Sequence, residues 1–323
     1  MTLETQVVTP AAETPQINIS ASGKALSHLQ LLRLHFVHHL TQDTSLPPFK
    51  GAIWHGVFGL ALKGVDEAAY ACLFDNTARA APWRLIAPAQ AETHLAAGGT
   101  LAAEVILFND AIAFAPACAE AIVQMGAYGF GEKRSHATLE TLTGHIGEKT
   151  VTISQLFSLP DATACGIYAN VIFAKLHDPR AERFELRFVT PLSLKAEGKP
   201  QRETPTVEAL VARTLGRLIG LLPDLPDGFI STADRTALLA HAEAIEATQT
   251  DVEWFHWERY SGRQKSTMPF GGLVGRVQYR GTPAAIAAVL PWLTLAQWIG
   301  LGSKTTFGQG QIALAVEQIP QLI

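Results

Sequence analysis

Cysteines, charged residues and long apolar runs are scarce in this sequence, and each scarcity excludes a class of protein. The three cysteines, Cys72, Cys118 and Cys165, lie far apart and are odd in number. They therefore predict neither a disulfide framework nor a CxxC metal site. No purely apolar run reaches the roughly 18 residues that a membrane span needs, and the polar first residues lack the core of a secretory signal. We expect a cytoplasmic protein with no membrane partner.

The overall charge excludes a broadly basic coat for nucleic acid. Charged residues make up 17% of the 323 residues, the net charge is −4 and the isoelectric point is about 6.3. Hydrophobic residues make up 48%, which predicts a globular chain long enough for two ordinary domains. Any site for a polyanion must therefore be local.

One such local site is indicated by a segment that has no acidic residue. Residues 259–316 contain no Asp or Glu. They contain six basic residues: Arg259, Arg263, Lys265, Arg276, Arg280 and Lys304. The preceding segment, 218–258, has the opposite bias, with eight acidic residues and one Arg. This asymmetry favours a basic face for a polyanion, the alternative being an unevenly charged solvated face.

Within that segment, residues 300–311 read GLGSKTTFGQGQ. Glycine permits a positive φ and a close approach of the backbone to another polymer. Backbone N–H groups, one lysine and several hydroxyls together suit a phosphate cradle. The stretch is not a nucleotide-binding GxxxxGK[ST] loop, because Lys304 lies between glycines rather than after the last one. The alternative is a plain turn or helix stop.

Hydrophobic periodicity predicts an α+β fold with the same order of elements in both halves. In the first half we expect strands at 29–40, 83–86, 101–108, 134–142 and 151–156 and helices at 51–63 and 111–125. In the second half we expect strands at 184–194, 254–260, 273–279 and 311–316 and helices at 206–222 and 283–299. Each order is β-α-β-β-α-β, which is typical of ferredoxin-like domains.

Domain boundaries follow from the same reading. Residues 1–24 are rich in Pro, Thr, Ser and Ala and are expected to be disordered. A turn signal at Asp178 and Pro179 places the boundary between the halves near 164–183. We therefore predict two tandem ferredoxin-like domains, at 25–170 and 180–323.

The C-terminal segment resembles a known family. The block FGGLVGRVQYRG at 270–281, a helical stretch and then WIGLGSKTTFGQGQ at 298–311 are similar to the C-terminal signature of the CRISPR-associated repeat-processing endoribonucleases, the Cas-six family of the RAMP superfamily. LPPFKGAIWHGVFGLAL and YGFGEKRSHATLE match more loosely. The resemblance is strong over roughly the last 60 residues and implies tandem RRM/RAMP-type domains and cleavage of RNA without metal or cofactor. The expected product carries a 2′,3′-cyclic phosphate.

Such chemistry needs a general base, a general acid and positive charge near the phosphorane. The resemblance makes His55 the first candidate for the base, because relatives carry a catalytic histidine in or just after this helix. Lys304 is the candidate that stabilises the transition state. Their alternative roles are a half-buried helix histidine and a surface lysine. His38 and His39 end a strand, so alternation sends them to opposite faces.

Further residues are candidates for RNA contact. Arg276 and Arg280 share a strand face by period two. Lys133 and Arg134, next to His136, form a basic turn. The predicted RNA-binding set is Lys133, Arg134, Arg276, Arg280, Gly300, Gly302, Thr305, Thr306, Gly308 and Gly310. The histidine spacing predicts no metal site.

Three functions remain open from the sequence. The first is a metal-independent endoribonuclease that binds CRISPR repeat RNA and cleaves precursor crRNA into guide RNAs. The second is a non-catalytic crRNA-binding RAMP subunit that works with other effector subunits; the loop after the helix of His55, which has no histidine here, favours it. The third is an α+β protein that binds another anion.

Overall fold

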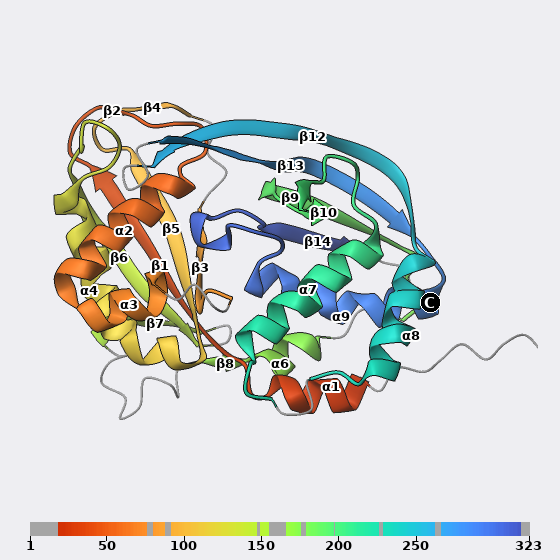
Figure 1. Ribbon diagram of the computed structural model, residues 1–323. Helices are drawn as coiled ribbons and strands as arrows, with labels where there is room; N and C mark the ends of the chain where they lie inside the picture. Colours follow the sequence, from red (N-terminus) through yellow and green to blue (C-terminus); the bar gives the residue numbers. More distant parts are fainter. Residues whose placement is uncertain are drawn as a thin grey trace, which may run out of the picture.

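The computed structural model describes residues 19–75, 80–87, 92–146, 149–154, 166–175, 179–196, 198–225, 229–261 and 266–317. Two halves lie side by side, each with an antiparallel sheet, and a long hairpin from the second half arches over the first (Figure 1). Mixed helix and antiparallel strand content confirms the predicted α+β class.

The first half is built on a sheet with the strand order β3-β5-β1-β6-β7. Its elements are β1 (Gln30–Leu40), α2 (Gly51–Val65), α3 (Glu67–Phe74), β3 (Trp83–Ile86), β5 (Thr100–Phe108), α4 (Ala115–Tyr128), β6 (Ala137–Ile146) and β7 (Lys149–Thr152). A short pair, β2 (Thr44–Ser45) and β4 (His94–Leu95), lies beside it. The first four sheet strands in chain order, β1, β3, β5 and β6, have the ferredoxin-like arrangement, with β1 and β5 central.

Alternation along β1 separates the two faces of this sheet. Leu32, Leu34 and Phe36 are fully buried, whereas Arg33 and His35 between them are partly exposed. Residues of α2 and α4 complete the same core cluster as the buried set, so these helices cover that face. The other face, which carries Arg33 and His35, is called the open face below.

The second half repeats the arrangement with the strand order β12-β13-β9-β14. Its elements are β9 (Arg183–Leu192), β10 (Lys195–Ala196), β11 (Lys199–Pro200), α7 (Val207–Leu221), α8 (Thr232–Glu243), β12 (Glu246–Ser261), β13 (Ser266–Arg280), α9 (Pro283–Ile299) and β14 (Ile312–Val316). Thr282 caps α9 by accepting a hydrogen bond from the backbone N–H of Ala285 at 3.3 Å, and Pro283 takes the first helical position. Both ends of this helix agree with the prediction.

The two halves share a continuous core. Leu31, Ile106 and Phe108, on the open face of the first sheet, are buried in the same cluster as the interior of the second half. The chain crosses between the halves through β8 (Ile167–Tyr168), which pairs with β1, and α6 (Ala169–Phe173), which packs on α9. The division at 25–170 and 180–323 stays a prediction.

The structure corrects several local predictions. Residues 19–24, expected to be disordered, begin the helix α1 (Ile19–Leu26); residues 1–18 lie outside the described residues. The strand expected at 151–156 ends at Thr152, and the last two of its positions lie outside the described residues. The strand expected at 254–260 begins at Glu246, and the helices α3 and α8 were not expected.

One stretch is long and apolar enough to cross a membrane. Asn109–Tyr128 has a mean hydropathy of 1.3 over its best window, but half of that window is buried inside the fold. It consists of a 3-10 turn followed by α4, whose buried residues, among them Ile122 and Met125, belong to the core of the first half. We therefore read it as a core helix, since buried helices of this composition are common in globular folds.

Candidate functional site

The glycine-rich loop at 300–311 connects α9 to β14 and crosses to the first half. Gly300, Gly302, Gly308 and Gly310 all have φ between 74° and 84°, and Lys304 has φ 60°. A Cβ at Gly310 would lie 1.8 Å from the carbonyl oxygen of Leu301, so only glycine fits there. The loop therefore has one conformation that its sequence specifies closely.

Backbone hydrogen bonds fix the loop to the second half. The N–H of Gly310 donates to the carbonyl of Pro191 at 3.1 Å, and the N–H of Ser303 donates to that of Ser193 at 3.0 Å. On the other side the loop touches α2, because a Cβ on Gly51 would lie 1.9 Å from the carbonyl oxygen of Phe307. The loop is thus a seam between the halves.

His55 projects from α2 onto this loop. Its Nδ1 lies 3.0 Å from the carbonyl oxygen of Thr306, and its ring stacks on Phe307 with a centroid distance of 3.7 Å and on Trp83 at 5.6 Å. A carbonyl can only accept, so Nδ1 carries the proton of this hydrogen bond. In the neutral ring Nε2 is then the basic nitrogen, which is the tautomer that a general base requires.

Lys304 lies on the same seam. Its Nζ sits 3.7 Å from the ring centroid of Phe270, which in turn packs edge-on against Phe307 at 5.2 Å. Burial lowers the pKa of Lys304, and the nearby charge of Lys195 lowers it further. A chain of ring contacts through Phe270 and Phe307 therefore connects Lys304 to His55, although the two lie far apart in the sequence.

The two candidate arginines on β13 share a face but have partners of their own. Arg276 and Arg280 alternate with the buried Val277 and Tyr279, as period two predicts. Arg276 pairs with Asp251 at 3.5 Å and Arg280 with Glu182 at 3.9 Å. Alternation also places Phe270 on their face, with Arg276 about 20 Å further along the strand.

The basic turn lies elsewhere in the first half. Lys133 and Arg134 are exposed, Arg134 has φ 49°, and Lys133 lines a hollow with residues of β2 and β4. The adjacent histidines on β1 fall on opposite faces, as predicted. His38 is fully buried with Nε2 3.0 Å from the carbonyl oxygen of Ile122, and His39 is partly exposed and pairs with Glu140.

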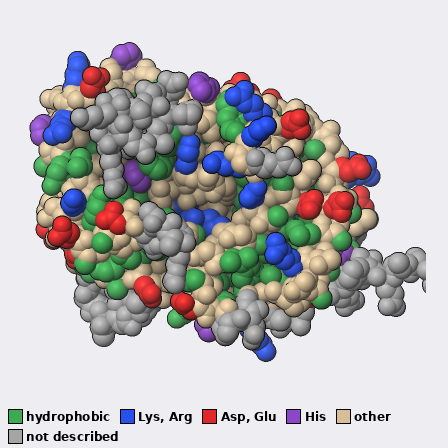
Figure 2. Space-filling view, in the orientation of Figure 1, with side chains coloured by type: hydrophobic (Ala, Val, Ile, Leu, Met, Phe, Trp, Pro, Cys, Tyr) green, Lys and Arg blue, Asp and Glu red, His purple; other side chains and the backbone are tan. Residues whose placement is uncertain are grey.

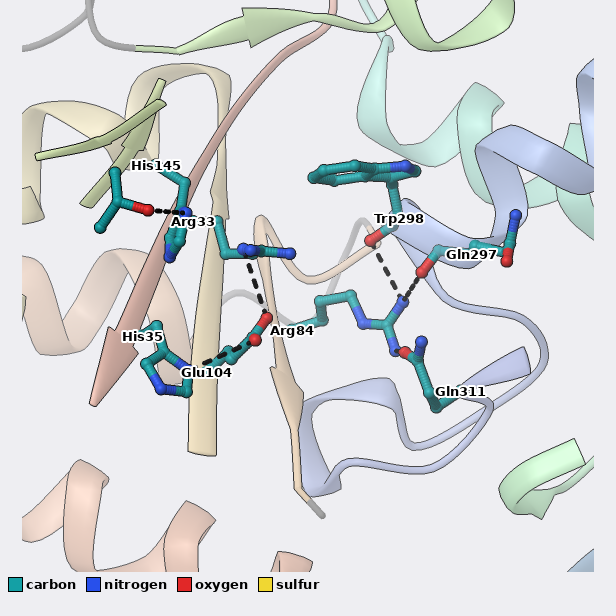
Figure 3. Close-up of polar contacts among 9 residues, drawn as sticks. Arg33, His35, Arg84, Glu104, His145, Gln297, Trp298 and Gln311 are labelled. Carbon is teal, nitrogen blue, oxygen red and sulfur yellow. Dashed lines mark hydrogen bonds and ion pairs between the residues drawn. The ribbon is translucent and has the colours of Figure 1, made fainter. Parts of the chain in front are cut away.

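Two arginines that sequence reasoning missed, one fully buried and one partly buried, hold the end of α9. Arg84 on β3 is fully buried; it donates from Nη1 to the carbonyls of Gln297 and Trp298, both at 3.1 Å, and from Nη2 to Oε1 of Gln311 at 2.6 Å (Figure 3). Arg217 on α7 donates to the carbonyl of Ile299 at 2.8 Å. Cations suit the last carbonyls of a helix, where the dipole is negative. Because the glycine-rich loop begins at the next residue, both arginines position it.

Beside Arg84, a polar cluster occupies the open face of the first sheet. Glu104 on β5 faces Arg33 at 3.5 Å and His35 at 3.4 Å, and His145 on β6 lies edge-on to His35 (Figure 3). Arg33 also lies over the ring of Trp298 at 5.6 Å. Burial lowers the pKa of His145, with Arg33 as the next cause. The sequence signal for this cluster was the polar alternation on β1.

The described residues contain no group of three or more His, Cys, Asp or Glu side chains that could hold a metal ion. A space-filling view shows the middle of the molecule hollowed between the two halves, with Lys and Arg side chains around the hollow (Figure 2). The seam and this hollow together form the candidate site.

Two family models match the chain, one in each half. Residues 186–312 match the family model of the CRISPR-associated endoribonuclease Cas6, and residues 29–158 match a model described only as an N-terminal domain. No curated protein matches the chain.

Solved structures show the fold. A Cas6 product complex is 19% identical with a TM-score of 0.57 over 88% of this chain and 99% of that one. A Cas6 from Thermus thermophilus is 16% identical with a TM-score of 0.55 over 88% and 98%. A chain of a partial Cas6-RT-Cas1–Cas2 complex is 15% identical with a TM-score of 0.62, and the match covers 92% of this chain and 48% of that one. The tandem ferredoxin-like architecture is therefore that of Cas6 proteins.

Proposed function

We infer that this chain, a RAMP protein of the Cas6 family, binds CRISPR repeat RNA and cleaves precursor crRNA into guide RNAs. The observation that carries the proposal is the contact between His55 and the glycine-rich loop. A helix of the first half and a loop of the second half meet there, and they bring an imidazole and an ammonium group to one backbone cradle. One of the similar structures is a Cas6 product complex, which supports the same activity here.

The proposed reaction needs no metal. Nε2 of His55 takes the proton of a ribose 2′-hydroxyl, whose oxygen attacks the adjacent phosphate. The bond from phosphorus to the 5′-oxygen of the next nucleotide breaks, that oxygen takes a proton from solvent water, and the product ends in a 2′,3′-cyclic phosphate. Lys304 stabilises the charge that develops on the phosphorane. Glycines at 302, 308 and 310 let the loop pack closely against Ser193, Ala87 and Leu301, which fixes the position of Lys304.

The other predicted RNA contacts take different places in this proposal. Thr305 and Thr306 belong to the loop itself, as does Gly300 at its start. Arg276 and Arg280 lie along the hairpin strand β13, on the face that carries Phe270. The turn of Lys133 and Arg134 lies beside β2 and β4, so it suits a part of the RNA other than the cleaved phosphodiester. Other CRISPR proteins are proposed partners, since a similar chain belongs to a Cas6-RT-Cas1–Cas2 complex.

The experiment is cleavage of repeat RNA from the host's array in EDTA, with wild-type protein and two variants. His55→Ala should lower the rate at least about 100-fold and leave binding within a few-fold. Lys304→Gly should lower the rate about 100-fold without loss of stability, because glycine accepts the φ of 60° more easily than lysine. His241→Ala on α8 is the matched control and should cleave like wild type.

Each result assigns a role. Full cleavage by His55→Ala removes this histidine from the mechanism. Tight RNA binding with no product from any form assigns the non-catalytic role in an effector complex. Loss of product in EDTA alone shows that a metal is needed. Binding of RNA that does not weaken with salt argues against phosphate recognition altogether.

A further inference from the structure

A second basic pocket adjoins the glycine-rich loop on the side of α7. Three segments enclose a volume of about 380 Å³: the chain after β9, one face of α7 and the first residues of the loop. Its basic lining residues are Lys195, Arg213 and Arg217, and Gly302 and Ser303 form the loop wall. Among the described residues, no acidic side chain lines it. The pocket therefore offers concentrated positive charge in a concave site.

Arg217 lines this pocket, and only some of its N–H groups have hydrogen-bond partners among the described residues. Its Nε donates to the carbonyl of Ile299, but its buried Nη2 has no hydrogen-bond partner among the described residues. Burial lowers the pKa of Arg217 to about 10. Arg217 therefore carries a positive charge beside the pocket that none of the described carboxylates compensates, and an anion in the pocket would compensate it.

The two other cations are held together at the rim. A guanidinium nitrogen of Arg213 donates to the backbone carbonyl of Lys195. Arg213 and Arg217 are one helical turn apart on α7, a spacing at which like charges destabilise a helix. None of the three cations has a carboxylate within ion-pair distance in the described part of the chain, whereas Arg276 and Arg280 each have one.

The pocket is electrostatically coupled to the proposed cleavage site. Lys195 is near enough to Lys304 to lower its pKa, after the larger effect of burial. The wall between the two sites is fixed, because Ser303 donates from both its backbone N–H and its hydroxyl to the carbonyl of Ser193. One RNA strand could therefore place one phosphate in the pocket and a neighbouring phosphodiester at the glycine-rich loop.

We propose that this pocket binds one phosphate of the RNA backbone, beside the phosphodiester held by the glycine-rich loop. The inference rests on the proposed function and adds a site that neither the Gly-rich signature nor His55 contains. Arg213 contacts the phosphate oxygens, and Lys195 and Arg217 neutralise its charge. The three cations act on a single phosphate, because the volume suits one nucleotide rather than several.

The test measures RNA affinity as a function of salt. Fluorescein-labelled repeat RNA is titrated with full-length protein in the His55→Ala background over a series of KCl concentrations. In the double variant Lys195→Ala, Arg213→Ala the slope of log K against log salt should fall in magnitude by up to about 0.7, the value for one phosphate of a single strand, and binding should be about tenfold weaker. Lys195→Ala alone should lose less of the slope, since Arg213 and Arg217 still act on the same phosphate.

Controls separate the pocket from a general charge effect. Arg235→Ala on α8 removes an exposed arginine from another surface and should leave the slope unchanged. Urea midpoints of the rim variants should equal that of the parent, because both side chains are exposed. Inorganic phosphate at constant ionic strength should shift the melting temperature of the parent no more than it shifts that of the double variant.

The outcomes distinguish this inference from the proposed function. RNA binding with an unchanged slope in the double variant overturns the pocket and leaves the nuclease proposal standing. A slope that falls equally in Arg235→Ala overturns it as well. Stabilisation by inorganic phosphate that is lost in the double variant, with an unchanged RNA slope, assigns the pocket to a free phosphate compound instead. Absence of RNA binding in the parent overturns both proposals.

Discussion

Gly310→Ala should damage the glycine-rich loop far more than the same change at a matched glycine. Gly310 has φ 74° and Gly98 has φ 80°, so an alanine pays the same backbone cost at either place. A Cβ at Gly98 meets nothing within 4 Å, whereas a Cβ at Gly310 would lie 1.8 Å from the carbonyl oxygen of Leu301. The difference between the two variants therefore isolates the clash from the conformational cost.

The magnitudes follow from the contacts. A left-handed alanine costs roughly 1–2 kcal/mol, which is the whole effect expected for Gly98→Ala. At Gly310 the loop must also move by more than 1 Å to reach an ordinary contact. This breaks the hydrogen bonds from Leu301 N–H to the Gly310 carbonyl and from Gly310 N–H to the Pro191 carbonyl. Each is worth about 0.5–1.5 kcal/mol, so Gly310→Ala should cost about 2–5 kcal/mol in total.

The assay is urea unfolding of the two variants beside wild type, together with cleavage of repeat RNA. We expect a lower midpoint for Gly310→Ala than for Gly98→Ala, and a loss of cleavage in Gly310→Ala alone. Equal midpoints for the two variants would refute the steric argument. Normal cleavage by Gly310→Ala would show that the RNA does not depend on this loop conformation.

Two further predictions concern buried polar groups. Arg84→Ala removes three hydrogen bonds from a charged donor and leaves helix-end carbonyls buried, so it should lower the free energy of unfolding in urea by about 3–5 kcal/mol. Arg84→Lys should recover part of this loss. A wild-type midpoint for the alanine variant would contradict the role of Arg84 in holding the end of α9. Burial lowers the pKa of His38 to about 4 from 6.5, so the unfolded chain takes up this proton first and stability should fall by about 3 kcal/mol as the pH drops from about 6.5 to 4. His38→Gln should remove that part of the pH dependence, and an unchanged pH profile would rule His38 out as its source.

Periodicity in the sequence predicted the elements that bury one regular face. The strand β1 alternates Leu32, Leu34 and Phe36 with polar residues, and α9 has a threonine cap followed by proline, so both were placed well. The first part of β12, from Glu246 to Glu253, has mostly polar residues and is largely exposed, so it lacks the apolar alternation by which strands are recognised. Backbone pairing with β13, rather than its own pattern, makes it a strand.

The candidate site was predictable in its parts and not in its assembly. His55 could be assigned to a helix and Lys304 to a glycine-rich loop, but the hydrogen bond from His55 reaches across 251 residues of chain. Arg84 is likewise 213 residues from the first carbonyl that it contacts. Arg213 and Arg217 have the spacing of one helical turn, but nothing in the sequence relates Lys195 to them. Only the fold brings these cations together, so composition and periodicity alone do not reveal the pocket.

The seam at Phe307 has a consequence for how such a protein can diversify. The loop belongs by chain to one half but rests on a helix of the other, so neither half expressed alone would present a finished centre. A chimaera that exchanges the first 170 or so residues between relatives would need to preserve the surface around Gly51 and His55 on which Phe307 sits. Changes in RNA preference should therefore accumulate on the outer hairpin and the far turn, while the two facing surfaces vary together.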